Sequence, residues 1–183
     1  MKRLSLIGLI VACLLGCQPG RDPKLPTGAD FLLQTADGPI DSRQLRGQVV
    51  LVYFGYTHCP DICPASLAAG GQALKALKPA ERARVKLLMI SVDPERDTVN
   101  HLKEYTAFFH PEVIGATGTP QEIAALAKAF GAGYIKQPAQ GDGSYAVDHT
   151  TATYLIGTDG KLSQVIELGA SPDAIVSAIR KHL

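Results

Sequence analysis

Hydrophobic residues along the chain fall into short continuous runs that are separated by longer stretches with helical spacing. Residues 49–54 and 85–92 are almost entirely apolar and rich in β-branched side chains. Such runs are typical of strands that are buried on both faces of a sheet. Shorter runs at 113–115, 151–156 and 162–168 predict further strands, the last two of them joined as a hairpin.

Four helices are predicted between and after these strands. The first follows residue 63 and stops at Pro79, and the second begins at Asp97, which we expect to cap it. The third begins with a capping box at residues 119–122, and the last begins at residue 171. The apolar positions on which these helices depend are Leu67, Gly71, Leu74, Leu77, Val99, Leu102, Tyr105, Phe109, Ile123, Leu126, Ala127, Phe130, Ile175 and Ile179. Upstream, residues 31–40 predict a small hairpin, and residues 42–45 predict one helical turn.

Two cysteines directly follow the first long strand, where open α/β sheets bind their ligands. Cys59 and Cys63 bracket three residues, and Pro64 follows. We expect Cys63 near the N-cap of the next helix, with Pro64 at the first helical position and Cys59 on the loop above, so neither cysteine would be helical. The positive end of the helix should lower the pKa of both thiols. The spacing leaves both a redox pair and a metal site open.

The order of the elements predicts a mixed α/β domain over residues 29–183. Strands alternate with helices, and a hairpin and a final helix follow. With a cysteine pair after the first long strand, we predict a thioredoxin-like fold, in which a central mixed sheet is flanked by helices and preceded by an N-terminal hairpin extension. With 183 residues, the chain is long enough for one such domain with a core of its own.

Residues 1–28 lie outside the predicted domain. Lys2 and Arg3 precede an apolar run over 4–15, which has the length of a signal-peptide core. We predict a lipoprotein-type signal peptide over 1–17 with Cys17 as the lipidated residue, and a Pro-rich linker over 18–28. Cys13 is an alternative lipidation site, and an uncleaved anchor or an ordinary signal peptide are alternative interpretations. Each of them places the domain outside the cytoplasm.

The charge of the chain excludes one class of partner. The formal net charge is +1, and no basic cluster lies beyond the extreme N-terminus, so the charge gives no electrostatic reason to expect binding to nucleic acid.

Two thiolates are an incomplete site for most metals, and the five histidines are the candidates for a third ligand. His149 is the best candidate, because it lies between a flexible polar loop and a strand that should face the cysteines. The pattern alone also allows a hydrogen-bonded loop histidine. His58 is a further candidate, whereas His101, His110 and His182 are predicted to be solvated surface residues. Asp148 could orient the ring of His149, and Asp93 could support the site or simply form a turn.

Three blocks of sequence resemble the SCO/SenC/PrrC family. They are residues 53–64, residues 91–98, and residues 147–150 together with 154–157. That family consists of thioredoxin-fold copper proteins that serve assembly of the CuA centre of cytochrome c oxidase. The resemblance implies that Cys59, Cys63 and His149 bind copper, as Cu(I) or Cu(II), and that the protein is a metallochaperone rather than an enzyme.

The resemblance also implies partners, and the predicted lipoprotein signal implies a location. The partners are the CuA-bearing oxidase subunit and, upstream, a periplasmic copper donor chaperone. The location is the bacterial cell envelope, with the domain on the periplasmic side of a membrane that holds its lipid anchor. Zinc is the competing metal, but structural zinc sites require four ligands, and only His58 or water could supply the fourth.

A membrane-tethered thiol–disulfide oxidoreductase is the rival hypothesis. It would use Cys59 and Cys63 to reduce the cysteines of an oxidase subunit or another copper-site partner. Thioredoxin-type reductases place a cis-proline before the strand that faces the cysteines, whereas residues 149–152 contain no proline. This difference disfavours general disulfide exchange. A peroxiredoxin and a pure interaction module are less consistent with the pattern.

Overall fold

The longest apolar run of the sequence becomes the central strand. All seven residues of β3 (Val49–Gly55) are buried, and β3 lies in the middle of a sheet with the order β5-β4-β3-β8-β9. On one side it pairs in parallel with β4 (Val85–Ser91), which pairs in parallel with β5 (Val113–Ala116). On the other side it pairs antiparallel with β8 (Thr153–Ile156), which continues antiparallel into β9 (Leu162–Ile166). The predicted mixed sheet is therefore confirmed.

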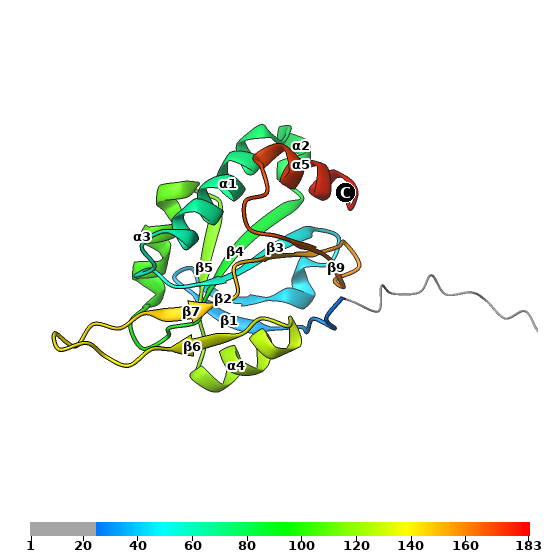
Figure 1. The fold of residues 1–183 in the computed structure, drawn as a ribbon. Helices are drawn as coiled ribbons and strands as arrows, with labels where there is room; N and C mark the ends of the chain where they lie inside the picture. The colour runs from blue at the N-terminus through cyan, green and yellow to red at the C-terminus, as the bar shows by residue number, and fades with distance from the viewer. Residues whose placement is uncertain (1–24) are drawn as a thin grey trace, which may run out of the picture.

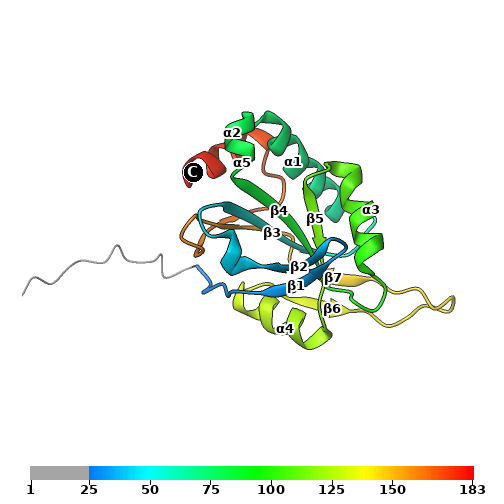
Figure 2. The same ribbon diagram turned by 180° about the vertical axis from the view of Figure 1, so that it is seen from behind.

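Helices cover both faces of this sheet (Figures 1 and 2). α1 (Ile62–Ala76) and α5 (Pro172–Arg180) pack against each other over one face, and α3 (Val99–Phe109) packs on β5 and α1. α4 (Pro120–Ala129) lies on the opposite side, and α2 (Pro79–Arg82) is a single short turn before β4. The arrangement is the thioredoxin-like one that the sequence predicts.

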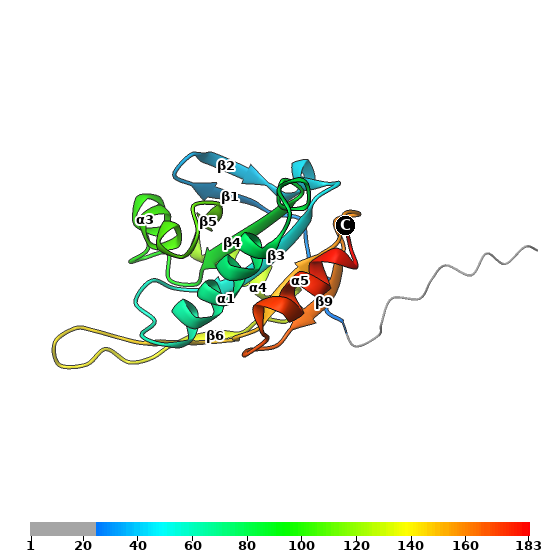
Figure 3. The same ribbon diagram turned by 90° about the horizontal axis from the view of Figure 1, so that it is seen from above.

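Two small antiparallel sheets complete the fold. β1 (Leu32–Thr35) and β2 (Gly38–Asp41) form the predicted N-terminal hairpin, and the 3-10 turn η1 (Ser42–Leu45) follows it. β6 (Tyr134–Lys136) pairs with β7 (Val147–His149), and the loop between them extends away from the body of the fold (Figures 1 and 3). This second pair of strands was not predicted.

Side-chain alternation along β3 connects the core to both helical layers. Tyr53 and Phe54 are adjacent and therefore point to opposite faces of the sheet. The rings of Phe54, Phe130 and Tyr154 meet edge to face in all three pairs, with ring centroids 5.6–5.8 Å apart. Each such pair contributes about 0.5–1.5 kcal/mol beyond its buried area. Tyr53 points to α1, where its hydroxyl reaches Cys63.

The capping signals are confirmed at α4 and α5 and wrong at α3. Thr119 and Glu122 form the expected capping box of α4, and the side chain of Ser171 caps α5. Thr98, rather than Asp97, caps α3 through a hydrogen bond from the His101 amide. Asp97 turns inward instead and is only 1% exposed, because Thr57 and Ser91 donate hydrogen bonds to its carboxylate.

The computed structural model describes residues 25–183. The predicted signal peptide, Cys13, Cys17 and residues 18–24 of the predicted linker lie outside that range. Between residues 25 and 183, none of the helices combines the length and the apolar character that crossing a membrane requires.

Gly115 tests how closely α3 packs on β5. A Cβ atom at this position would lie 2.6 Å from the Leu102 Cβ and 2.9 Å from the Leu102 backbone. We therefore expect Gly115→Ala to lower the free energy of unfolding by about 1–3 kcal/mol, which is typical of overpacking. Urea unfolding followed by circular dichroism measures the change. Gly133→Ala is the matched control, because a Cβ there meets no atom within 4 Å; an equal loss in both variants would contradict the packing argument.

Candidate metal centre

The loop that follows β3 brings the two cysteines to the start of α1. Cys59 lies on this loop and is partly exposed, whereas Cys63 is the second residue of α1 and is 0% exposed. The Cys63 amide donates a hydrogen bond to Cys59 Sγ over 3.4 Å. The sulfur of Cys59 thus takes one of the amide hydrogens that the first turn of a helix leaves without an intrahelical partner.

The predicted start of this helix was wrong by a few residues. Asp61 is the N-cap and α1 begins at Ile62, so Cys63 is helical and Pro64 is the third helical residue. Proline fits there because the first-turn amides have no intrahelical acceptor to lose. Burial of the Cys63 side chain outweighs the extended preference of a residue before proline.

Burial also shifts the pKa of Cys63 in the direction opposite to the expected one. We expected the positive helix end to lower the pKa of both thiols, but desolvation raises the pKa of Cys63 to about 12. A hydrogen bond from the Tyr56 backbone and the hydroxyl of Tyr53, 3.7 Å from Cys63 Sγ, lower the pKa again, but only in part. Cys63 is therefore a neutral thiol near pH 7 in the metal-free protein, and a metal ion that binds there must displace its proton.

His149 lies directly against the buried sulfur. Its Nε2 is 3.3 Å from Cys63 Sγ, and its Nδ1 is 3.0 Å from the Thr150 carbonyl oxygen. A carbonyl only accepts hydrogen bonds, so Nδ1 carries the ring proton and Nε2 keeps a lone pair for a metal ion. The rings of Tyr53 and Tyr56 meet the imidazole edge to face, with centroids 6.0 and 5.7 Å away.

Together, the three predicted ligands form a group that can hold a metal ion. One ligand atom from each of Cys59, Cys63 and His149 lies within 4.8 Å of the other two. In the part of the chain that the structure describes, this is the one group of three or more His, Cys, Asp or Glu side chains with such spacing.

His149 belongs to a strand and not to a flexible loop. It is the last residue of β7, and Tyr134 is its partner in β6. Two residues earlier, the buried Val147 amide donates a hydrogen bond to the Tyr56 hydroxyl over 3.2 Å. Tyr56 therefore holds β7 against the loop of the cysteines, through its hydroxyl and through its ring.

The other histidines do not belong to the group of three candidate ligands. His58 and His101 are exposed, and both face the Thr57 hydroxyl; His182 is partly buried near the C-terminus. His110 was wrongly predicted as a solvated residue. It is 6% exposed, its Nδ1 accepts a hydrogen bond from the Glu112 amide, and burial lowers its pKa.

The two candidate supporting carboxylates have different positions. Asp148 is exposed and accepts a hydrogen bond from Gln137, while the Thr150 carbonyl orients the ring of His149 in its place. Neighbouring residues of a strand point to opposite faces, which separates Asp148 from the imidazole. Asp93 forms the expected turn, since its carbonyl accepts hydrogen bonds from the amides of Arg96 and Asp97.

The side chain of Asp93 does more than form a turn. It is 3% exposed and accepts hydrogen bonds from Arg96 and from the Tyr145 hydroxyl. Arg96 in turn donates to the Tyr145 carbonyl over 3.0 Å, and its guanidinium lies 3.5 Å from the Tyr145 ring centroid. These contacts anchor the chain just before β7.

Sequence reasoning missed Tyr53, Tyr56, Arg96 and Tyr145, although three of the four lie inside the blocks that surround the cysteines and Asp93.

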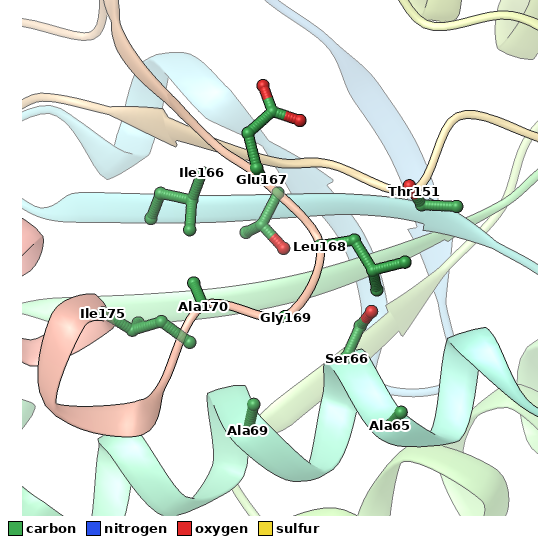
Figure 4. A pocket seen from close by; sticks show the side chains of 11 residues that line it. Ala65, Ser66, Ala69, Thr151, Ile166, Glu167, Leu168, Gly169, Ala170 and Ile175 are labelled. Carbon is green, nitrogen blue, oxygen red and sulfur yellow. The ribbon is translucent and has the colours of Figure 1, made fainter.

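A small pocket lies beside the site, between α1 and the segment that follows β9 (Figure 4). Ser66 and Thr151, which shortly follow Cys63 and His149 in sequence, contribute hydroxyls to it, and Leu168 also lines it. Its volume of about 100 Å³ is small for an organic ligand, since such sites usually exceed roughly 300 Å³. The chemistry of this region therefore rests on the three ligands and not on a substrate pocket.

Comparison with known proteins relates this site to one family. Residues 20–183 match the family model described as SCO1/SenC. The chain is 39% identical over 157 residues to the mitochondrial SCO2 homolog of Bos taurus. The aligned region covers 84% of this chain and 59% of that protein. The chain spans about half to three-fifths of the length of the first curated relatives that it matches.

Solved structures agree with this match. The copper-bound structure of Bradyrhizobium japonicum ScoI has a TM-score of 0.78 and 36% identity, covering 85% of this chain and 99% of that one. A structure of BsSco, described with a disulfide switch and as a member of the Sco family of cytochrome c oxidase assembly proteins, has a TM-score of 0.69. It is 32% identical and covers 90% of this chain and 98% of that one.

Tyr56→Phe tests whether the tyrosine hydroxyl positions the strand of His149. The change leaves the buried Val147 amide without its acceptor, so we expect the free energy of unfolding to fall by about 1–3 kcal/mol. We also expect weaker metal binding, because β7 loses its link to the cysteine loop. Chemical unfolding and metal titration measure the two effects.

Tyr134→Phe is the control for this variant. It removes a tyrosine hydroxyl from the partner strand β6, and that hydroxyl makes no hydrogen bond among residues 25–183. Equal behaviour of the two variants would show that the Tyr56 hydroxyl does not position His149.

Proposed function

The chain belongs to the SCO1/SenC family, and on that premise we propose that it is a copper metallochaperone with Cys59, Cys63 and His149 as its ligands. The convergence of two sulfurs and one imidazole nitrogen within 4.8 Å is the observation that carries this proposal. Thiolates select Cu(I), and imidazole is a good ligand for both Cu(I) and Cu(II), so this set suits copper in either state.

The ligand count favours copper over zinc. Structural zinc sites are closed by four protein ligands. Among the described residues, no fourth His, Cys, Asp or Glu joins the group, and Nδ1 of His58 lies instead 3.1 Å from the Thr57 hydroxyl. A three-ligand site suits a carrier, because it leaves room for an acceptor ligand to approach the metal during transfer.

The relatives support copper as the cargo and oxidase assembly as its destination. Bradyrhizobium japonicum ScoI binds copper in its structure, and BsSco is described as a member of a family of cytochrome c oxidase assembly proteins. We propose that this chain receives copper from a periplasmic donor chaperone and delivers it to the CuA-bearing subunit of cytochrome c oxidase. Lipidation at Cys17 would hold it at a membrane of the bacterial cell envelope, with the domain on the periplasmic side.

A second function uses the same two sulfurs. Cys59 and Cys63 are both free, and the Cys63 amide already contacts Cys59 Sγ at 3.4 Å, so a modest movement of the loop would let them form a disulfide. This geometry favours reduction of the cysteines of a dedicated copper-site partner as the alternative activity. Cys59 would then be the attacking thiol, because it is the more exposed of the two.

Anaerobic Cu(I) competition titration of the fully reduced protein tests the chaperone proposal. We expect one tightly held Cu(I) per chain. His149→Ala should weaken the affinity by at least ~10-fold, since even the loss of a group that only supports a ligand costs about that much. Cys59→Ala or Cys63→Ala should abolish tight binding.

His182→Ala provides the matched control, because it removes an imidazole that is absent from the three-ligand group. Weak copper binding that is indifferent to His149 would contradict the chaperone proposal and favour the thiol–disulfide reductase. His149→Ala should leave the oxidation of Cys59 and Cys63 to a disulfide intact.

Oxidation of the thiols gives an independent check of the ligands. A Cys59–Cys63 disulfide has no thiolate to offer, so we expect the oxidised protein to bind no Cu(I), and reduction to restore binding. The same titration before and after reduction measures this. Undiminished Cu(I) binding by the oxidised protein would overturn the assignment of both cysteines.

A further inference from the structure

Two exposed histidines meet at one hydroxyl next to the cysteine loop. Nδ1 of His58 and Nε2 of His101 each lie 3.1 Å from Oγ1 of Thr57. His58 comes from the loop after β3 and His101 from the first turn of α3, and their ring centroids are 6.1 Å apart. Folding therefore brings together two imidazoles that are 43 residues apart in sequence (58 to 101).

A buried carboxylate lies directly beneath this hydroxyl. Asp97 is 1% exposed, and it accepts hydrogen bonds from the Thr57 hydroxyl at 2.6 Å, the Thr57 amide at 3.1 Å and the Ser91 hydroxyl at 2.6 Å. Because the Thr57 hydroxyl donates to Asp97, the lone pairs of its oxygen face the two imidazoles.

The charge of Asp97 has no fixed counter-ion nearby. In the described part of the chain, no lysine or arginine forms an ion pair with it, and the nearest cationic candidate is His58, whose Nδ1 is 3.9 Å from Oδ1. A buried negative charge of this kind is stabilised by a cation. A cation that stabilises the Asp97 carboxylate would lie at the surface, among His58, His101 and Thr57.

We propose that His58 and His101 bind a divalent transition-metal ion at a second site, supported by Thr57 and Asp97 and separate from the thiolate site. Imidazole nitrogen with hydroxyl oxygen suits Cu(II), Zn(II) and Ni(II), whereas Cu(I) prefers sulfur. An ion bonded to Nδ1 of His58 and Nε2 of His101 at roughly 2.0–2.1 Å would replace the two hydrogen bonds that now converge on Thr57. The proton on each of these nitrogens would move to the other nitrogen of its ring by exchange with water, which leaves a lone pair for the metal. The exposed rings can rotate to close that distance.

The site differs from the thiolate site in position and in chemistry. His58 is absent from the group of Cys59, Cys63 and His149, although it precedes Cys59 in sequence. The first turn of α3 carries partial positive charge, which opposes a cation there, while Asp97 offsets it. We therefore expect weaker binding than at the thiolates. The second site shares no ligand with the thiolate site, so metal binding there is independent of the proposed function.

Cu(II) titration of the full chain with the changes Cys59→Ser, Cys63→Ser and His149→Ala tests the proposal. We expect one Cu(II) per chain, with nitrogen hyperfine structure from two imidazoles in its electron paramagnetic resonance spectrum. Adding His101→Gln should weaken binding by at least ~10-fold and remove one nitrogen from the spectrum. Cys13 and Cys17 are the same in every variant, so they do not affect the comparison.

Adding His182→Ala instead is the matched control and should change neither quantity. Binding that survives His101→Gln unchanged, or that falls equally with His182→Ala, would overturn the proposal. Circular dichroism checks the fold of each variant. Should the combined variant not fold, the same titration on the wild-type chain, with Cys59 and Cys63 oxidised to a disulfide, gives the comparison between His101→Gln and His182→Ala.

Discussion

Close contact between a sulfur atom and a glycine determines the geometry of this site. Gly55 ends β3, and a Cβ atom there would lie 2.8 Å from Cys63 Sγ and 2.7 Å from the Tyr53 ring. Only a residue without a side chain lets the first turn of α1 approach the strand so closely. The same approach removes Cys63 from water, raises its pKa and puts its sulfur beside the imidazole of His149. A metal ion therefore competes with a proton for this sulfur, which makes the affinity depend on pH.

Polar side chains at one edge of the sheet hold the third ligand in place. Tyr56 follows β3, Asp93 and Arg96 follow β4, and all of them contact Tyr145 or Val147 just before His149. β3 and β4 are parallel, so their carboxyl ends meet at the same edge, where α/β sheets form their ligand sites. The position of His149 thus depends on individual hydrogen bonds and ring contacts between segments that are distant in sequence, in addition to the packing of the core.

Apolar periodicity was sufficient to predict the central sheet and the main helices, because each has a buried face long enough to show a pattern. The three ligands were found from residue type and order, with the help of the family resemblance. β6 and β7 escaped prediction, since three-residue strands with exposed side chains such as Ile135 carry almost no periodic signal. Asp97 and His110 were misplaced for another reason: both are polar residues at helix ends whose burial depends on partners from other elements.

The hairpin of β6 and β7 is a sheet of its own, separate from the five strands of the core. Of the candidate ligands, Cys63 is built into the core through α1, whereas His149 is attached to this outer ribbon. Substitutions at exposed positions of the ribbon, such as Ile135, can therefore change how long a metal stays bound without disturbing the core, in which Val147 of the same ribbon is packed. At such positions, the residence time of a bound metal and the thermal stability can consequently vary independently, both in evolution and in protein engineering.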